Sequence, residues 1–260
     1  MPFLEVPGAR VYYELHGPKP AEAPAIVFVH GAGGNHLSWW QQVPAFMDRY
    51  CCLVYDVRGW GRSLETDDAR SGAPWPADLA RLLDATGIDR ATLVAQSMGG
   101  WTCLPFAAQH PQRVERLLMC GTHGGLRTPA IDALWREARA APPPPAGVHP
   151  AAGERMAREQ PALHFLYVEI SLLNRPQSPD QLAPYFRDAP SLSPDDVSTL
   201  AVPVLFISGA EDSVIPAAAL AEAAQVVPNA RLEVVPAAGH SVYFERAERF
   251  NELLTHFLGA

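Results

Sequence analysis

The chain has 260 residues, of which 48% are hydrophobic and 18% charged, and its formal net charge at pH 7 is -8. This length suits one large domain with a single core and room for an insertion, and the composition is too apolar for a disordered chain. An acidic chain without a run of Lys or Arg is a poor partner for nucleic acid or an anionic membrane surface, so we expect neither.

The first residues show no basic segment followed by an apolar one, and no apolar stretch approaches the roughly 20 residues of a membrane span. We therefore expect a cytoplasmic protein. Four cysteines, Cys51, Cys52, Cys103 and Cys120, lie in apolar runs. Their spacing fits neither a disulfide framework nor a metal site, so we predict buried free thiols and no metal.

The predicted elements begin with two short strands, at residues 3–6 and 10–15, joined by a Pro-Gly turn. Continuous apolar runs of strand length follow, separated by helical patterns. The runs cover residues 25–30, 51–56, 91–96 and 114–120, and the helices cover residues 77–85 and 98–109. Continuous apolar strands that alternate with helices are typical of a parallel sheet covered on both faces.

This alternation stops between about residues 124 and 199. The chain there is rich in proline, and helical patterns occur at residues 131–140 and 163–173 without regular strand patterns. The alternation resumes with strands at residues 202–209 and 230–236 and helices at residues 217–226 and 245–258. We therefore predict an α/β core, residues 1–124 and 198–260, interrupted by a helical cap insertion, residues 125–197.

The segment "TLVAQSMGG", residues 92–100, ends an apolar strand on a serine followed by small residues. A nucleophilic serine needs such a sharp strand-to-helix turn, where the positions two before and two after it must be small. Ala95 replaces the first glycine of the G-x-S-x-G pattern and adds only one methyl group, while Gly99 fills the second small position. Ser97 is therefore the candidate nucleophile.

A serine nucleophile needs a base, and the base needs a carboxylate that orients it. Two later strands end in polar residues: "VLFISGAEDSVIP" leads into Glu211 and Asp212, and "LEVVPAAGH" ends at His240. The carboxyl ends of parallel strands meet at one edge of the sheet, where α/β proteins place catalytic groups. We predict His240 as the general base, with Asp212 or Glu211 as its acid partner.

With these segments the sequence resembles the α/β-hydrolase family over nearly the whole chain outside the insertion. The resemblance rests on H-G-x-x in "HGAGG", on D-x-R-G-x-G-x-S in "DVRGWGRS", on G-x-x-D-x-x-x-P at Gly209, Asp212 and Pro216, and on the Gly-His pair at residues 239–240. It implies the α/β-hydrolase fold: a mostly parallel central sheet flanked by helices, with a helical cap insertion.

The resemblance also implies roles for individual residues. It favours Asp212 over Glu211 as the acid, because the offset of Asp212 from Pro216 matches the family. It places the oxyanion hole at the backbone N–H groups of Ala32 and Met98, with Gly33 as the alternative to Ala32. The motif at residues 56–63 is expected to tie loops together near this segment.

Side chains near these motifs and in the insertion are candidates for substrate contacts. They are Gly33, His36, Trp39, Trp135, Phe165 and Tyr167. Trp101, in the helix after Ser97, is instead predicted to pack in the core. A cap over the site would exclude water and shape the pocket.

Together these residues predict a serine hydrolase that cleaves a carboxylic ester or lactone of a small, fairly hydrophobic substrate through an acyl-enzyme, without a cofactor. The oligomeric state is not predicted. One alternative is a carbon–carbon bond hydrolase of the meta-cleavage product type, although such enzymes usually carry an aromatic residue where Ser241 follows His240. A second is a ligand receptor that keeps the fold and triad without turnover, and the first residues also resemble those of enol-lactonases.

Overall fold

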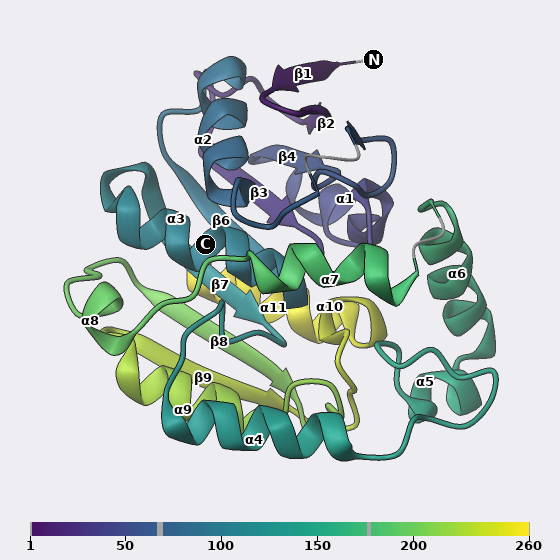
Figure 1. The fold of residues 1–260 in the computed structure, drawn as a ribbon. Coiled ribbons are helices and arrows are strands. Elements are labelled where there is room, and N and C mark those ends of the chain that lie inside the picture. The colour runs from purple at the N-terminus through teal and green to yellow at the C-terminus, as the bar shows by residue number, and fades with distance from the viewer. Residues whose placement is uncertain (1, 67–69, 176–177, 260) are drawn as a thin grey trace.

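The computed structural model describes residues 2–66, 70–175 and 178–259, and its centre is one sheet (Figure 1). The strands run in the order β1-β2-β4-β3-β6-β7-β8-β9, with β5 beside β2. Their bounds are β1 Phe3–Val6, β2 Ala9–His16, β3 Ala25–Val29, β4 Cys51–Tyr55, β5 Leu64–Glu65, β6 Ala91–Gln96, β7 Val114–Cys120, β8 Val204–Gly209 and β9 Ala230–Val235. From β4 to β9 all neighbouring strands are parallel, whereas β2 pairs antiparallel with its neighbours. The predicted mostly parallel sheet is confirmed.

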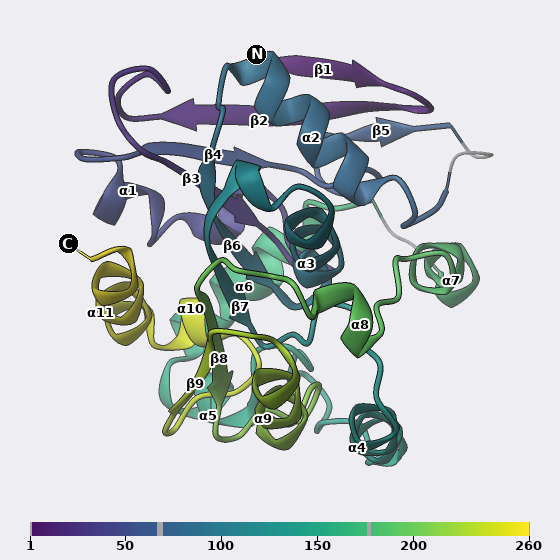
Figure 2. The ribbon, with the colours of Figure 1, turned by 90° about the vertical axis from the view of Figure 1, so that its left-hand side faces the viewer.

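Each central strand is apolar on both faces because helices cover the sheet on both sides (Figure 2). In β3, for example, Val27 and Val29 join one buried cluster, and Ile26 and Phe28 join the other. One face packs against α2 Trp75–Thr86, α3 Gly100–Gln109 and α9 Ala217–Val226. The opposite face packs against α1 Val43–Phe46, α10 Val242–Glu245 and α11 Ala247–Leu258.

The last predicted helix begins two residues later than expected. We expected a helix over residues 245–258, but α11 spans Ala247–Leu258, and Glu245 ends a separate short helix, α10. Arg246 between them has φ -133 and ψ 53, which no helix contains. The break sets α10 apart as a single turn, which directly follows the predicted base, His240.

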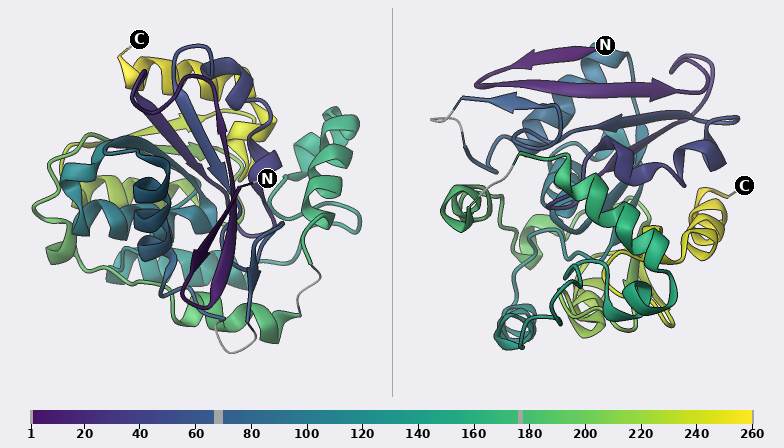
Figure 3. Two further views of the ribbon diagram at one scale, coloured as in Figure 1. Left: turned by 90° about the horizontal axis from the view of Figure 1, so that it is seen from above. Right: turned by 90° about the vertical axis from the view of Figure 1, so that its right-hand side faces the viewer.

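Between β7 and β8 the described residues form helices and no strand of the sheet. These helices are α4 Pro129–Ala140, α5 Glu154–Glu159, α6 Pro161–Leu172, α7 Pro179–Arg187 and α8 Pro194–Val197. The chain leaves and re-enters the core at neighbouring points, because Leu126 and Leu192 pair in an isolated bridge. Helix α4 packs against α9, whereas α6, in the middle of the segment, faces the viewer in the right-hand view of Figure 3.

Short elements at the sheet edge were not predicted. The 3-10 helix η1, His36–Trp39, follows the glycine-rich segment after β3 and is capped by Asn35, whose side chain accepts a hydrogen bond from the N–H of Leu37. Two further 3-10 turns are η3 Ser97–Gly99 and η4 Pro111–Arg113. Within the part of the chain that the structure describes, no helix has the length and apolar character needed to cross a membrane.

Candidate active site

Ser97 stands at the turn between β6 and η3. Its φ of +46 lies in the left-handed region that non-glycine residues rarely adopt, at a cost of about 1 kcal/mol or more. A Cβ at Gly99 would lie 2.3 Å from the carbonyl oxygen of Val29, so this position requires glycine. Ala95 is fully buried in β6. The departure from G-x-S-x-G at residue 95 is therefore compatible with a sharp turn at Ser97.

His240 and Asp212 form a buried pair at the carboxyl edge of the sheet. Nδ1 of His240 lies 2.9 Å from Oδ2 of Asp212, and the two residues are 2% and 8% exposed. The other carboxylate oxygen, Oδ1, accepts hydrogen bonds from the N–H groups of Val214 and Ile215, each at 2.9 Å. Because an ionised carboxylate only accepts hydrogen bonds, Nδ1 is assigned the proton and Nε2 is left able to accept one.

Glu211, the alternative acid, points elsewhere. Its carboxylate pairs with Arg155 of α5, whose Nη2 lies 2.6 Å from Oε1, and the Glu211 side chain is 42% exposed. Of the two acids considered, the structure therefore brings Asp212 to His240.

Gly121, the first residue after β7, gives His240 the space it needs. A Cβ at residue 121 would lie 3.0 Å from Nδ1 of His240, and φ is +57 there. In the sheet β7 lies between β6 and β8, so the imidazole packs across the end of β7. Since Nδ1 faces Asp212, Nε2 is left free to accept a proton, and Ser97 stands at the end of β6, the strand next to β7. A general base for Ser97 requires this orientation.

The glycine-rich segment after β3 lies directly against the strand-to-helix turn at Ser97. A Cβ at Gly31 would lie 2.8 Å from Cβ of Ser97, and the N–H of Gly34 donates to the carbonyl of Gly31 at 3.0 Å, which closes a tight turn. Ala32 and Met98, the candidate oxyanion donors, line the same cavity as Ser97. The two candidate donors and the candidate nucleophile therefore face one space.

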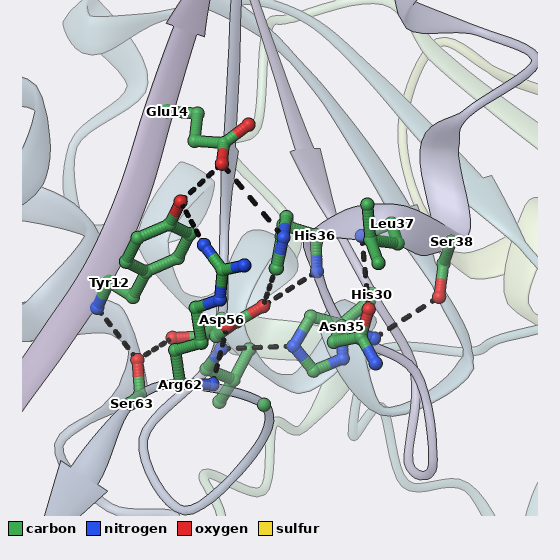
Figure 4. Close-up of polar contacts among 12 residues, drawn as sticks. Tyr12, Glu14, His30, Asn35, His36, Leu37, Ser38, Asp56, Arg62 and Ser63 are labelled. Carbon is green, nitrogen blue, oxygen red and sulfur yellow. Dashed lines mark hydrogen bonds and ion pairs between the residues drawn. The ribbon is translucent and has the colours of Figure 1, made fainter. Parts of the chain in front are cut away.

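A buried network of hydrogen bonds fixes the position of the glycine-rich segment (Figure 4). Nδ1 of His30 donates to the carbonyl of Gly31 at 2.8 Å, and Nε2 accepts from the N–H of Val57 at 2.9 Å. Burial lowers the pKa of His30, so the ring stays neutral and can play both roles. Oδ1 of Asp56 accepts from the N–H and from Nδ1 of His36, at 2.6 and 2.8 Å.

Asp56 is the centre of this network. Its burial alone would raise the pKa, but the hydrogen bond and charge of His36 and the N–H of Arg62 together lower it below its usual value. The N–H of Arg62 donates to Oδ2 at 2.7 Å. The neighbouring Arg58 forms a two-bond ion pair with Asp78 of α2, at 2.6 and 2.8 Å. Asp56 of the "DVRGWGRS" motif thus ties the motif to the segment after β3, whereas Arg58 ties it to α2.

A cavity of about 810 Å³ opens above Ser97 and extends beneath the insertion. Its apolar walls come from Trp101 of α3, Trp135 of α4, Phe186 of α7 and Ile215, which lies in the loop after β8. Prolines 142–144 line the cavity as well. A volume of this size is within the usual range for small-molecule sites. Among the residues that the structure describes, no three His, Cys, Asp or Glu side chains gather closely enough to hold a metal ion.

Among the six candidates for substrate contacts, Trp135 lines the cavity and the other five lie elsewhere. Trp39 is fully buried, with its ring centroid 4.6 Å from that of Tyr243, so it belongs to the core. Phe165 is 65% exposed on the outer face of α6. His36 is bonded to Asp56, as described above.

The last two candidates have structural contacts with other segments. The carbonyl of Gly33 accepts a hydrogen bond from Nδ2 of Asn174 at 2.7 Å. Tyr167 is buried beside Ser241, with its hydroxyl 3.1 Å from Oγ. Neither position follows from the sequence, because both depend on where α6 packs.

Trp101 packs in the core, as predicted, and it also lines the cavity. Its centroid lies 5.9 Å from that of Trp135 and 5.0 Å from that of His123. Burial lowers the pKa of His123 to about 4, so this ring is neutral near pH 7. Arg139, also in the cavity wall, lies over the Trp135 ring at 4.7 Å. The sequence contained one indication that Trp101 could line the cavity, because this residue lies in the helix that directly follows Ser97.

Glu245 of α10 supports the turn that carries His240. Its carboxylate accepts hydrogen bonds from the N–H groups of Gly239 at 2.8 Å and Ser241 at 3.1 Å, on either side of His240. The residue is 3% exposed. Burial raises the pKa of Glu245 from 4.5 to about 7, and the hydrogen bonds to Gly239 and Ser241 oppose this shift only in part.

The pH dependence of the free energy of unfolding is expected to reflect the raised pKa of Glu245. Because the folded state keeps the proton up to about pH 7, the contribution of Glu245 is greatest below pH 4.5 and is lost as the pH rises to about 7. A shift of this size corresponds to about 3 kcal/mol. The free energy of unfolding in urea, measured for wild type and Glu245→Gln, should give a difference that falls by about 2–3 kcal/mol over this range. A difference that stays constant with pH would contradict the assignment.

A scan against protein-family models matches residues 26–253 to the alpha/beta hydrolase family. The match covers most of the chain. The chain therefore belongs to the alpha/beta hydrolase family.

Relatives with different activities resemble this chain to a similar degree. A putative carbamate hydrolase, RutD, of Caulobacter sp. (strain K31) is 28% identical over 95% of both chains. A 2-hydroxymuconate semialdehyde hydrolase of Pseudomonas putida is 29% identical over 94% of this chain and 85% of the relative. The solved structure of an enol-lactonase from Burkholderia xenovorans LB400 superposes with a TM-score of 0.76, 26% identity and full coverage of both chains. The comparisons therefore show a hydrolase family, whereas the bond that is cleaved differs among the named relatives.

Proposed function

We propose that this hydrolase cleaves a carboxylic ester or lactone of a small, fairly hydrophobic substrate through an acyl-enzyme. Oγ of Ser97 attacks the carbonyl carbon while Nε2 of His240 takes the hydroxyl proton, and Asp212 stabilises the imidazolium. The N–H groups of Ala32 and Met98 donate to the oxyanion. His240 then returns the proton to the leaving group, and water attacks the acyl group to release the acid.

The observation that carries this proposal is the orientation of His240. Its Nδ1 is held by Asp212 at 2.9 Å, which leaves Nε2 free for the proposed proton transfer from Ser97. Ser97 shares its cavity with both candidate oxyanion donors. A nucleophile, an oriented base and two backbone donors at one cavity are the parts that acyl transfer requires.

Residues 125–197 are proposed to act as the cap of this site. Trp135 and Phe186 from this segment line the cavity together with Trp101 from the core. Apolar walls of this kind favour an acyl or leaving group with an apolar body, and they keep bulk water out of the pocket. The division into core and cap, like a cytoplasmic location, remains a prediction of the sequence.

Carbon–carbon bond hydrolysis is the second candidate, because a relative with 29% identity is named as a 2-hydroxymuconate semialdehyde hydrolase. The same Ser, His and Asp would serve either reaction. A carbamate is a third type of substrate that the named relatives suggest.

A substrate panel separates these activities. We expect wild type to hydrolyse p-nitrophenyl esters and lactones faster than a dienoic ring-cleavage product or a carbamate, when kcat/KM is measured for each by absorbance or by pH change. Preference for the dienoic substrate would replace the ester and lactone proposal by carbon–carbon hydrolysis. A folded protein that is inactive on the whole panel would contradict it as well.

A further inference from the structure

The side chain of Ser241, next to the candidate base, is bonded to the insertion. It is fully buried, and its Oγ donates to the carbonyl of Ala151 at 2.6 Å. Because its one proton is used there, Oγ accepts a hydrogen bond from the hydroxyl of Tyr167 at 3.1 Å. Ala151 lies in the loop before α5, and Tyr167 lies on α6. The residue after His240 is thus joined to two parts of the insertion.

Tyr167 is held in place by its own surroundings. The residue is 8% exposed, and its ring packs edge-on against Phe244 at a centroid distance of 4.9 Å. Burial raises the pKa of Tyr167 to about 12, so the hydroxyl keeps its proton and remains a donor. The contact with Ser241 is therefore a fixed hydrogen bond between neutral groups in a dry environment, where such bonds are strong.

The same helix also holds the segment with the candidate oxyanion donor. Nδ2 of Asn35 donates to the carbonyl of Ile170 at 2.8 Å. Asn174, just after α6, donates to the carbonyl of Gly33 at 2.7 Å and accepts from the N–H of Gly61. One helix of the insertion therefore contacts both the His240 turn and the glycine-rich segment around Ala32.

We propose that Tyr167 and Ser241 are positioning residues through which helix α6 holds His240 in its reactive orientation. The inference rests on the proposed function, since it assigns His240 the role of base. The His240 turn then has two anchors: Glu245 binds the N–H groups on both sides of it from the core, and Ser241 ties it to the insertion. A loosened turn would place Nε2 out of reach of Ser97 for part of the time, without changing the cavity wall.

The test compares Ser241→Ala and Tyr167→Phe with wild type on one p-nitrophenyl ester. Misplacement of a reacting group by a fraction of an ångström lowers the rate of the chemical step, so we expect kcat to fall about tenfold in Ser241→Ala and about threefold in Tyr167→Phe. KM should stay within about twofold, because neither side chain lines the cavity. The double variant should be no slower than Ser241→Ala, since both changes remove the same link.

Tyr185→Phe is the matched control. Tyr185 is a fully buried tyrosine of α7 whose hydroxyl bonds Glu65, so this variant removes a buried hydroxyl from the insertion without touching the His240 turn. We expect similar thermal stability to Tyr167→Phe but a kcat within about twofold of wild type. Equal losses of kcat in the two variants would point to general destabilisation and would overturn the inference.

A second readout does not depend on turnover. The Nδ1 proton of His240, shared with Asp212, gives a downfield proton NMR resonance that should broaden or shift in Ser241→Ala and stay unchanged in Tyr185→Phe. An unchanged resonance with an unchanged kcat in Ser241→Ala overturns the inference while the proposed function stands. Wild type without Ser97-dependent activity overturns the proposed function, and the resonance then still decides whether α6 positions His240.

Discussion

Replacing Ser97 by alanine is expected to lower kcat for an activated ester by at least about 10³-fold, because the variant has no atom that can form the acyl-enzyme. The free energy of unfolding should change by less than about 1 kcal/mol, since the hydroxyl lies at the edge of the cavity and the backbone turn remains. Stopped-flow or steady-state absorbance measures the first quantity, and urea unfolding measures the second.

Ser241→Ala is a useful control for this variant. It also exchanges one hydroxyl for hydrogen, close to the same site, and is expected to lose only about tenfold in kcat. If Ser97→Ala kept more than about 1% of the wild-type rate while remaining folded, the assignment of Ser97 as nucleophile would be wrong.

Replacing Asp212 by asparagine is expected to lower kcat by about 10³- to 10⁴-fold, a loss comparable to that of Ser97→Ala. The amide cannot stabilise the imidazolium, and it can donate to Nδ1, which favours the tautomer whose proton is on Nε2. That tautomer cannot accept the proton of Ser97. The pH dependence of kcat should be measured together with its value, because Asp212 acts through His240.

Glu211→Gln is the matched comparison, since it makes the same chemical change one residue away. The wild-type Glu211 carboxylate pairs with Arg155 at the cavity rim and not with His240, so we expect kcat of the variant to stay within about fivefold of wild type. Equal losses in Asp212→Asn and Glu211→Gln would mean that the geometry at His240 does not decide which acid is used.

Much of the fold follows from the sequence because its signals are local. The strands at residues 91–96 and 114–120 were predicted with their observed bounds, since each is a continuous apolar run that ends at a polar or turn residue. The break at Arg246 carried no such signal, because apolar spacing continues through residues 242–258. In the structure Glu245, next to this break, binds the N–H groups on either side of His240, a tertiary contact that the sequence pattern does not contain.

The candidate site could be predicted only in part. The order of Ser97, Asp212 and His240 at strand ends marks them in the sequence, whereas substrate contacts depend on how helices pack. Trp39 and Trp101 both stand near motifs and both are buried, yet Trp101 lines the cavity and Trp39 does not. The proline-rich residues 142–144 have no helical or strand period, so the path that brings them to the cavity was not predictable.

The central claim is a covalent intermediate on Ser97, and mass spectrometry after reaction with diethyl p-nitrophenyl phosphate tests it most directly. The account predicts one diethyl phosphoryl group per chain, located on Ser97 by peptide mapping, with loss of esterase activity in proportion to labelling. The Ser97→Ala protein should remain unlabelled. Labelling at another residue with equal loss of activity, or full activity after labelling of Ser97, would contradict the account.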